Sequence, residues 1–252
     1  MDKNNNLKKY TISIITVCYN AVAELEETIL SVINQTFQDY EYIIIDGGSK
    51  DGTLDIINKY KDKITFWISE PDKGIYDAMN KGLNYASGEW INFMNAGDIF
   101  TNNNVLTQIF SYTYQKDIKF LYSDNFYRQK NGKLLLSSNS HEKLCLLHQS
   151  SIYKKDLHKK HGMYIVTSQI IISDFLFFCR IEEQCFKKID TIISINTMDG
   201  VSSQAWCRTQ YLCALVVFRK INMKTLFIKY TAFRLKLLFP FLYNLINLFR
   251  KK

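Results

Sequence analysis

The chain has 252 residues, a length that suits one large domain or one domain with an appendage. Hydrophobic residues make up 47% of it, enough for a sizeable core, so the composition excludes a wholly disordered chain. The net charge of +8 is uneven, because residues 205–252 hold ten Lys or Arg and no Asp or Glu, which leaves −2 for residues 1–204.

The six cysteines include no C-x-x-C pair, and the four histidines show no cysteine spacing typical of a zinc site. We therefore expect free thiols in a reducing compartment. Residues 1–10 are polar and lack an apolar signal core, so secretion is not indicated.

Strand and helix patterns alternate through the first hundred residues. Apolar runs predict four strands, and apolar positions on one face predict helices between them. Such strand–helix units favour a parallel sheet with right-handed crossovers, which is the α/β class. The predicted strands are Thr11–Val17, Tyr42–Ile45, Thr65–Ser69 and Trp90–Met94, and the predicted helices are Ala23–Asn34, Thr53–Tyr60 and Ile75–Ala86.

The pattern is less regular beyond residue 100, and Leu144–Tyr153 stays unassigned. After about Ala205 the composition shifts to Leu, Phe, Tyr, Lys and Arg, which separates a globular domain, 1–204, from a tail, 205–252. The predicted elements are a strand at Phe120–Tyr122, a hairpin over Phe126–Ser137 around Asn131-Gly132, a helix over Ile170–Ile181 and a strand over Ile189–Ile195.

Polar residues follow the predicted strands of the first half. Asp46 ends the apolar run Tyr42–Ile45, and Asn20, Asp72 and Asp98 follow the other strands. In a parallel sheet the carboxyl ends of strands share one edge, where open α/β sheets bind ligands. The alternative for each residue is an ordinary turn or cap, because Asn and Asp favour turns.

Four segments, in order and at similar spacing, resemble motifs of the family 2 glycosyltransferases, which have the GT-A fold of nucleotide-diphospho-sugar transferases. The resemblance is strong over residues 11–100, looser to about 203 and absent in the tail. It implies a nucleotide-sugar-binding half, 11–100, and an acceptor half, 101–204. The matching segments are Ile14–Ala21, Asp46–Thr53, Glu70–Gly82 and Asn95–Asp98.

The resemblance implies a donor site for a nucleotide sugar, with UDP as the default nucleotide. Asp46 resembles the carboxylate that accepts hydrogen bonds from the base, and Asp98 resembles the ligand of a divalent metal, Mn²⁺ or Mg²⁺. Asn95 and Gly97 replace carboxylates that many relatives carry, so Asp98 is the only ionised ligand in the motif. The donor nucleotide positions are Thr16, Cys18, Asn20, Asp46, Gly48, Asp72, Lys73, Asn95, Ala96 and Gly97.

Ser173–Arg180 resembles the helix that carries the base for the acceptor hydroxyl, which makes Asp174 the catalytic residue. Asp174 is also a lone acid in an apolar run, so burial is expected to raise its pKa. The alternative is a helix cap. The family chemistry implied is inverting transfer of the hexosyltransferase type. The acceptor- or sugar-facing positions are Asp77, Asp124, His148, Gln149 and Ser202.

The tail combines basic and apolar residues. The apolar stretch Leu237–Phe249 is too short and broken to span a bilayer, which needs ~20 apolar residues. The tail as a whole suits basic amphipathic helices that lie on an anionic membrane. The alternative is a pair of ordinary packing helices with solvated lysines. We expect a cytoplasmic enzyme, peripheral on the inner face of the cytoplasmic membrane, that uses a lipid-linked or oligosaccharide acceptor in bacterial polysaccharide or lipopolysaccharide biosynthesis. Nucleic acid is not an expected partner, because no recognition module accompanies the charge.

Two other functions stay open. A nucleotidyltransferase needs a glycine-rich, basic phosphate loop after the first strand, and Cys18–Val22 has neither feature. A non-catalytic scaffold of the same fold is supported only by the reduced Asn95–Asp98 motif.

Overall fold

The computed structural model describes residues 10–197 and 205–238. Contacts divide the chain into two units, Met1–Gly200 and Val201–Lys252, and each is described by itself.

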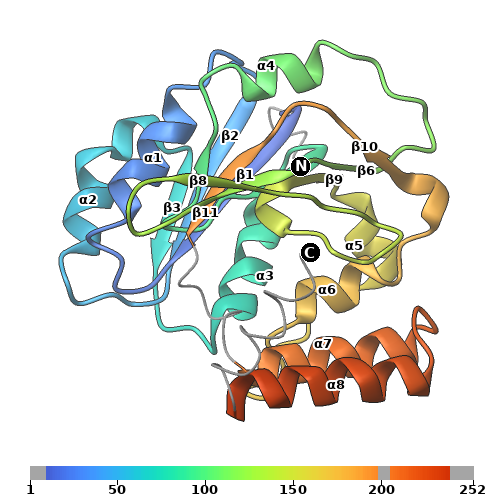
Figure 1. The fold of residues 1–252 in the computed structure, drawn as a ribbon. Coiled ribbons are helices and arrows are strands. Elements are labelled where there is room, and N and C mark those ends of the chain that lie inside the picture. The colour runs from blue at the N-terminus through green and yellow to red at the C-terminus, as the bar shows by residue number, and fades with distance from the viewer. Residues whose placement is uncertain (1–9, 198–204, 239–252) are drawn as a thin grey trace, which may run out of the picture. The chain divides into compact units, whose positions relative to one another are not determined.

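A seven-stranded central sheet organises the first unit, in the order β10-β6-β9-β4-β1-β2-β3 (Figure 1). All neighbouring pairs are parallel except the two that involve β9, which runs against β4 and β6. The mostly parallel α/β fold is therefore confirmed. The strands are β1 (Ile12–Cys18), β2 (Tyr40–Asp46), β3 (Phe66–Ser69), β4 (Trp90–Phe93), β6 (Phe120–Tyr122), β9 (Ser151–Lys154) and β10 (Phe186–Lys188).

Apolar clusters lie on both faces of this sheet. In β1, Ile12 and Ile14 belong to the cluster that includes Leu25 of α1, whereas Ile15 belongs to the cluster that includes Met79 of α3. This alternation explains why the central strands are apolar along their whole length. The helices of this unit are α1 (Leu25–Ile33), α2 (Thr53–Lys59), α3 (Ile75–Tyr85), α4 (Val105–Phe110), α5 (Asp156–His161) and α6 (Ser173–Phe178), with short 3₁₀ turns η1 (Lys61–Lys63), η2 (His148–Ser150) and η3 (Glu183–Cys185).

A second sheet has the order β5-β11-β7-β8, with β5 (Ile99–Phe100), β7 (Asn125–Arg128), β8 (Leu134–Ser137) and β11 (Ser194–Thr197). β7 and β8 form the predicted hairpin. The late strand was predicted too early, because Ile189 still donates to the carbonyl of Tyr122 at the edge of the central sheet. Residues 189–193 cross between the sheets, and the strand starts only at Ser194.

The second unit contains α7 (Ala205–Val217) and α8 (Met223–Leu238). The tail is helical there, as predicted, but α8 lacks a distinct apolar face. Lys224, Lys229 and Arg234 are five residues apart, and at about 100° per residue they point in different directions around the helix. The expected basic amphipathic tail, 205–252, stays a prediction, because residues 239–252 lie outside the described part of the chain. Within residues 10–197 and 205–238, every helix is too short or too polar to cross a bilayer.

Candidate active site

The loop after β2 folds around the carboxylate of Asp46, which has no exposed surface. Its Oδ2 accepts hydrogen bonds from the N–H groups of Gly48 (3.0 Å) and Ser49 (2.9 Å) and from the Ser69 hydroxyl (2.6 Å). Oδ1 accepts from the Ser49 hydroxyl (2.5 Å). Gly48 has φ 85°, a conformation that favours glycine. Asp46 thus shapes the turn, and its contact with a donor base stays a prediction.

The pKa of Asp46 is set by two opposed effects. Burial raises it, but the hydrogen bonds from Ser49, Ser69 and Gly48 favour the charged carboxylate and hold the pKa below its usual value. Asp46 is therefore an anion at neutral pH.

Asn20 joins the loop after β1 to the loop after β2. Its N–H donates to Ser49 Oγ (2.7 Å), and its side-chain oxygen accepts from the N–H of Lys50 (3.0 Å). Asn20 is exposed and has φ 47°, in the left-handed region that Asn tolerates. The exposed side chain is consistent with a position beside a ligand.

Thr16 and Cys18 lie deeper than the predicted donor role suggested. Thr16 has no exposed surface, donates to the carbonyl of Met94 (2.7 Å) and pairs with the Tyr42 hydroxyl (2.9 Å). Cys18 is buried, and burial followed by the charge of Asp46 raises its thiol pKa. In this structure both residues support the sheet beneath the loops.

The loop after β3 lies against the loop after β2. A Cβ atom on Gly47 would come within 2.5 Å of Asp72 Oδ2, so the absence of a side chain at Gly47 makes room for this carboxylate. Asp72 Oδ1 accepts from the N–H of Gly74 (2.8 Å), and Asp77 Oδ2 accepts from that of Lys73 (3.0 Å). These two acids thus stabilise the start of α3, while the Lys73 side chain is exposed.

Asp98 ends the loop after β4 and is 6% exposed. Gln149 donates to its Oδ2 (2.7 Å), and the N–H of Thr197 donates to Oδ1 (3.2 Å). Thr28 anchors the loop by accepting from Gly97 N–H (3.0 Å) and donating to the Asp98 carbonyl (2.9 Å). Burial raises the pKa of Asp98, and the hydrogen bond from Gln149 partly offsets this effect.

His148 reaches the same edge because β9 is antiparallel to β4 and β6, so its amino end adjoins their carboxyl ends. His148 Nε2 lies 2.9 Å from Asn95 Nδ2, and Nδ1 lies 2.9 Å from Asp174 Oδ2. The Tyr76 hydroxyl donates to Asp174 Oδ1 (2.7 Å). The ring packs edge-on against Phe93. Four segments distant in sequence therefore form one hydrogen-bonded chain.

The pKa of Asp174 departs from the expectation of a raised value. Burial raises it, but the hydrogen bond and charge of His148, with the hydrogen bond from Tyr76, outweigh burial and lower the pKa. The prediction considered only the apolar run around Asp174 and was wrong in direction. Asp174 is a stable anion with both oxygens engaged.

Several buried amide atoms around Asp98 lack a hydrogen-bond partner among the residues that the structure describes. They include Asn92 Oδ1, Asn95 Oδ1 and Gln149 Oε1. A buried polar atom without a partner is costly. Their grouping indicates a site built for a polar ligand, such as one that carries hydroxyl or phosphate groups.

The donor set around Asp98 fits a hard divalent cation only in part. In the described ranges, no three His, Cys, Asp or Glu residues form a group that could hold a metal by themselves. Asp98 supplies one carboxylate, and Mg²⁺ usually retains water and phosphate oxygens beside one or two carboxylates. The chemistry fits an ion that Asp98 shares with a diphosphate.

One sugar-facing prediction, Asp124, falls outside this cluster. Asp124 pairs with Lys188 (2.6 Å) and accepts from the N–H of Asn139 (2.8 Å), so its carboxylate is engaged in these contacts. Ser202 lies outside the described residues. Ala96 supports the loop by donating its N–H to the carbonyl of Val17.

Sequence reasoning missed three residues of the site. Tyr76 lies inside the motif Glu70–Gly82 but was not singled out, although its hydroxyl donates to Asp174 Oδ1. Ser69 and Thr197 contact Asp46 and Asp98 from other strands. Their contacts depend on strand pairing, which no local pattern predicts.

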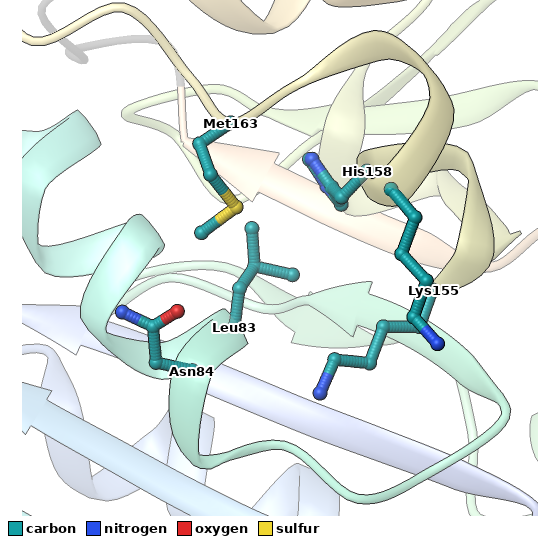
Figure 2. A pocket seen from close by; sticks show the side chains of 6 residues that line it. Leu83, Asn84, Lys155, His158 and Met163 are labelled. Carbon is teal, nitrogen blue, oxygen red and sulfur yellow. The ribbon is translucent and has the colours of Figure 1, made fainter.

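A small pocket of about 190 Å³ lies elsewhere, between the end of α3 and α5 (Figure 2). None of the predicted site residues lines it. His158 on its wall is satisfied, with Nδ1 3.0 Å from the Gly162 carbonyl and Nε2 3.0 Å from the Tyr153 hydroxyl. The pocket is lined by Leu83, Asn84, Lys155, His158, Lys159 and Met163.

The model of the family described as glycosyl transferase family 2 matches residues 13–172. The chain belongs to this family. The match includes the loops after β1 to β4 and His148, and ends two residues before Asp174.

Two groups of relatives illustrate the likeness. An uncharacterized glycosyltransferase of Mycobacterium tuberculosis is 38% identical over 99 residues, 39% of this chain and 38% of the relative. A PGL/p-HBAD biosynthesis glycosyltransferase of Mycobacterium bovis is 29% identical over 181 residues, 66% of this chain and 68% of the relative. The match thus spans well under half of the first relative.

Solved structures show the same fold. Staphylococcus aureus TarS 1-349 in complex with UDP-GlcNAc has a TM-score of 0.64 and 21% identity, covering 75% of this chain and 59% of that one. The mannosyltransferase PcManGT from Pyrobaculum calidifontis, in complex with GDP-Man and Mn²⁺, has a TM-score of 0.61 and 14% identity, covering 80% and 61%. These neighbours are GT-A glycosyltransferases, and the fold of this chain is GT-A.

Proposed function

We propose that this glycosyltransferase moves a hexose, with inversion, from a nucleotide-diphosphate donor to a hydroxyl of a growing, lipid-linked surface glycan. Such a glycan is an O-antigen, a capsule or an exopolysaccharide. The observation that carries the proposal is the cluster of Asp98–Gln149 and Asp174–His148 at the carboxyl edge of a family 2 sheet. The Mycobacterium bovis relative is named for PGL/p-HBAD biosynthesis, and this name supports a biosynthetic glycosyltransferase.

The donor is a UDP-sugar by default. TarS carries UDP-GlcNAc in its solved complex, which supports UDP, whereas PcManGT carries GDP-Man. The joined loops of Asn20, Gly48 and Asp72 form the nucleotide end of the site. Asp98 would hold a divalent ion together with the diphosphate, and such an ion would supply positive charge to offset that of the leaving group. The unpartnered side-chain oxygens of Asn95 and Gln149 accept hydrogen bonds from hydroxyl groups of the donor.

Asp174 and His148 supply the base. The acceptor hydroxyl must lose its proton as its oxygen attacks the anomeric carbon, so a basic group must lie within hydrogen-bond reach. Asp174 is ionised, and its hydrogen bond to His148 forms a connected proton-accepting pair.

The tail unit brings the enzyme to an anionic membrane on the cytoplasmic side. Val217, Phe227 and Leu238 are 75%, 70% and 63% exposed. Exposed Lys224 and Lys229 lie in the same unit, and residues 205–252 carry no acid. Apolar side chains among unopposed cations suit an anionic lipid surface, even without a single amphipathic face.

The decisive experiment is a screen of nucleotide sugars for transfer and hydrolysis, with bacterial membranes as the source of acceptor. Transfer from one donor, lost in Asp98→Ala, supports the proposal. Calorimetry with UDP or GDP and Mn²⁺ tests the nucleotide separately. Nucleotide binding without transfer of any sugar favours a nucleotidyltransferase, and absence of both favours a non-catalytic scaffold.

The membrane proposal has its own test. Sedimentation with phosphatidylglycerol vesicles should capture the full chain, and phosphatidylcholine vesicles should capture much less. Replacing Lys224 and Lys229 by Glu should abolish capture. Replacing the exposed Lys61 and Lys63 by Glu is the matched control and should change it little. Equal capture by both vesicles contradicts the electrostatic argument.

A further inference from the structure

We propose that the chain forms a dimer in which the edge strand β8 pairs, antiparallel, with the β8 strand of a second copy. The inference concerns assembly and does not depend on the proposed transfer reaction. The pairing would extend the sheet β5-β11-β7-β8 into one sheet shared by two chains.

β8 lies at one edge of the second sheet, and β7 is its only partner among the described strands. Leu134, Leu135 and Leu136 of β8 are 41%, 50% and 56% exposed. Because successive side chains of a strand point to opposite faces, the exposure of three in a row means that neither face of β8 is covered. An exposed apolar strand at a sheet edge is a template for pairing with another chain.

The hairpin contacts decide which backbone groups of β8 are free. The N–H of Gln129 donates to the carbonyl of Lys133 (2.9 Å), so these two residues form a hydrogen-bonded pair. Hydrogen-bonded and non-hydrogen-bonded pairs alternate along antiparallel strands, so Leu135 directs its N–H and C=O to β7. The N–H and C=O of Leu134 and Leu136 therefore point away from β7, toward the open edge.

One two-fold register satisfies all of these free groups. When the axis passes beside Leu135, Leu134 lies opposite Leu136 of the second copy, and each such pair exchanges two hydrogen bonds. Every leucine of β8 then lies opposite a leucine, so apolar side chains meet on both faces of the new sheet. The edge is therefore complementary to itself.

Charge favours the same register. Lys133 lies opposite Ser137 of the second copy, so the cation meets a neutral hydroxyl. A parallel, in-register pairing would instead place the two Lys133 side chains next to each other, and adjacent like charges destabilise a sheet. An antiparallel register shifted by two residues would set Leu135 against Lys133 or Ser137. This self-complementarity identifies the occupant of the edge as a second copy of the chain.

The edge is held in a fixed orientation by the rest of the first unit. Arg128 of β7 donates two hydrogen bonds to the carboxylate of Glu27 in α1, each 2.7 Å long. β7 also pairs with β11 on its other side. Because the hairpin is already ordered, pairing with a second copy costs little further conformational entropy.

Analytical ultracentrifugation of the full chain tests the dimer. A series from about 1 µM to about 1 mM is suitable, because a single edge pairing lies at the small end of specific interfaces. Leu136→Pro removes an N–H that points to the open edge, and proline is tolerated on edge strands. The variant should keep the fold but weaken dimerisation at least about tenfold, because it deletes half of the interchain hydrogen bonds.

A second variant and a control accompany this measurement. Leu135→Lys sets two cations opposite each other at the axis, and it should also weaken dimerisation at least about tenfold. Phe227→Ser is the matched control, because it removes an exposed apolar side chain from α8, and it should leave the dimer unchanged.

Cysteine cross-linking tests the register independently. The exposed Cys145 and Cys213 are first replaced by Ser. Leu135→Cys should then form an interchain disulfide, because opposite residues of a non-hydrogen-bonded pair have Cα atoms about 4.5 Å apart. Leu134→Cys should not, because its counterpart lies about 9 Å away across the axis.

Two results overturn the inference. The first is a chain that stays monomeric throughout the series and gives no Leu135→Cys cross-link. The second is a dimer that Leu136→Pro and Leu135→Lys leave intact, or that Phe227→Ser abolishes, which assigns the association to the second unit. A failure of sugar transfer would contradict only the proposed function.

Discussion

Replacing Asp46 by Asn tests the electrostatic design of the loop after β2. The carboxylate accepts four hydrogen bonds from Gly48, Ser49 and Ser69 and has no exposed surface. The side-chain amide of the variant must turn its oxygen toward the backbone N–H groups of Gly48 and Ser49, because its NH₂ group in that position would face two other donors. Its nitrogen then faces the Ser49 hydroxyl, which already accepts from the N–H of Asn20.

The magnitude follows from these four bonds. A hydrogen bond to a charged group contributes about 1.5–3 kcal/mol and a neutral one about 0.5–1.5 kcal/mol, so the change loses about 1 kcal/mol for each bond. Removing the buried charge recovers part of this sum, because burial opposes ionisation of Asp46. We expect Asp46→Asn to lower the free energy of unfolding by about 2 kcal/mol at pH 7.

The pH dependence has a definite sign. The folded-state pKa of Asp46 lies below its unfolded value, so its stabilisation is present above about pH 4 and is lost as the pH falls through the folded pKa. The difference between wild type and Asp46→Asn should therefore shrink in acid.

Urea denaturation at pH 7 and at pH 3 measures both effects. Asp39→Asn is the control, because Asp39 is exposed and accepts one side-chain hydrogen bond, from Thr11. Its effect should stay within about 0.5 kcal/mol. Equal stability of Asp46→Asn and wild type at pH 7 would refute the reasoning.

Three further predictions follow from the described residues. Gly88→Ala should destabilise the fold by about 2–3 kcal/mol, because its Cβ would lie 2.4 Å from Ser13 N. The control is Gly132→Ala, which has open space around the new Cβ and φ 79°, and should cost about 1 kcal/mol. Equal melting temperatures of the two variants would contradict the steric argument. Burial lowers the pKa of His158 to about 4, so the unfolded state binds its proton first and stability should fall by about 3 kcal/mol as the pH drops from about 6.5 to about 4. His158→Gln should remove that part of the acid dependence in denaturation curves, and an unchanged dependence would exclude His158 as its source. Asp98→Asn should weaken UDP binding at least tenfold when Mn²⁺ is present, and should leave UDP binding without metal similar, as measured by calorimetry. An equal loss of UDP affinity with and without Mn²⁺ would indicate a structural role for Asp98.

The sequence by itself determined the first half of the fold. Apolar runs such as Tyr42–Ile45 and the polar turns after them are local signals, and β1 to β4 and α1 to α3 formed within a few residues of their predicted bounds. It also indicated that Asn20, Asp46, Asp72 and Asp98 share one sheet edge, because parallel strands bring their carboxyl ends together. The segment 144–153 gave no such signal, although it contains His148 and most of β9.

Only the tertiary structure decided the chemistry of Asp174. Its local sequence is apolar and predicted a raised pKa. The reversed strand β9 brings His148 from 26 positions away, and α3 brings Tyr76 from 98 positions away, and together they lower the pKa. Burial can be inferred from neighbours in sequence, whereas hydrogen-bond donors from distant segments depend on strand order and direction. Those donors determine whether a buried carboxylate stays charged.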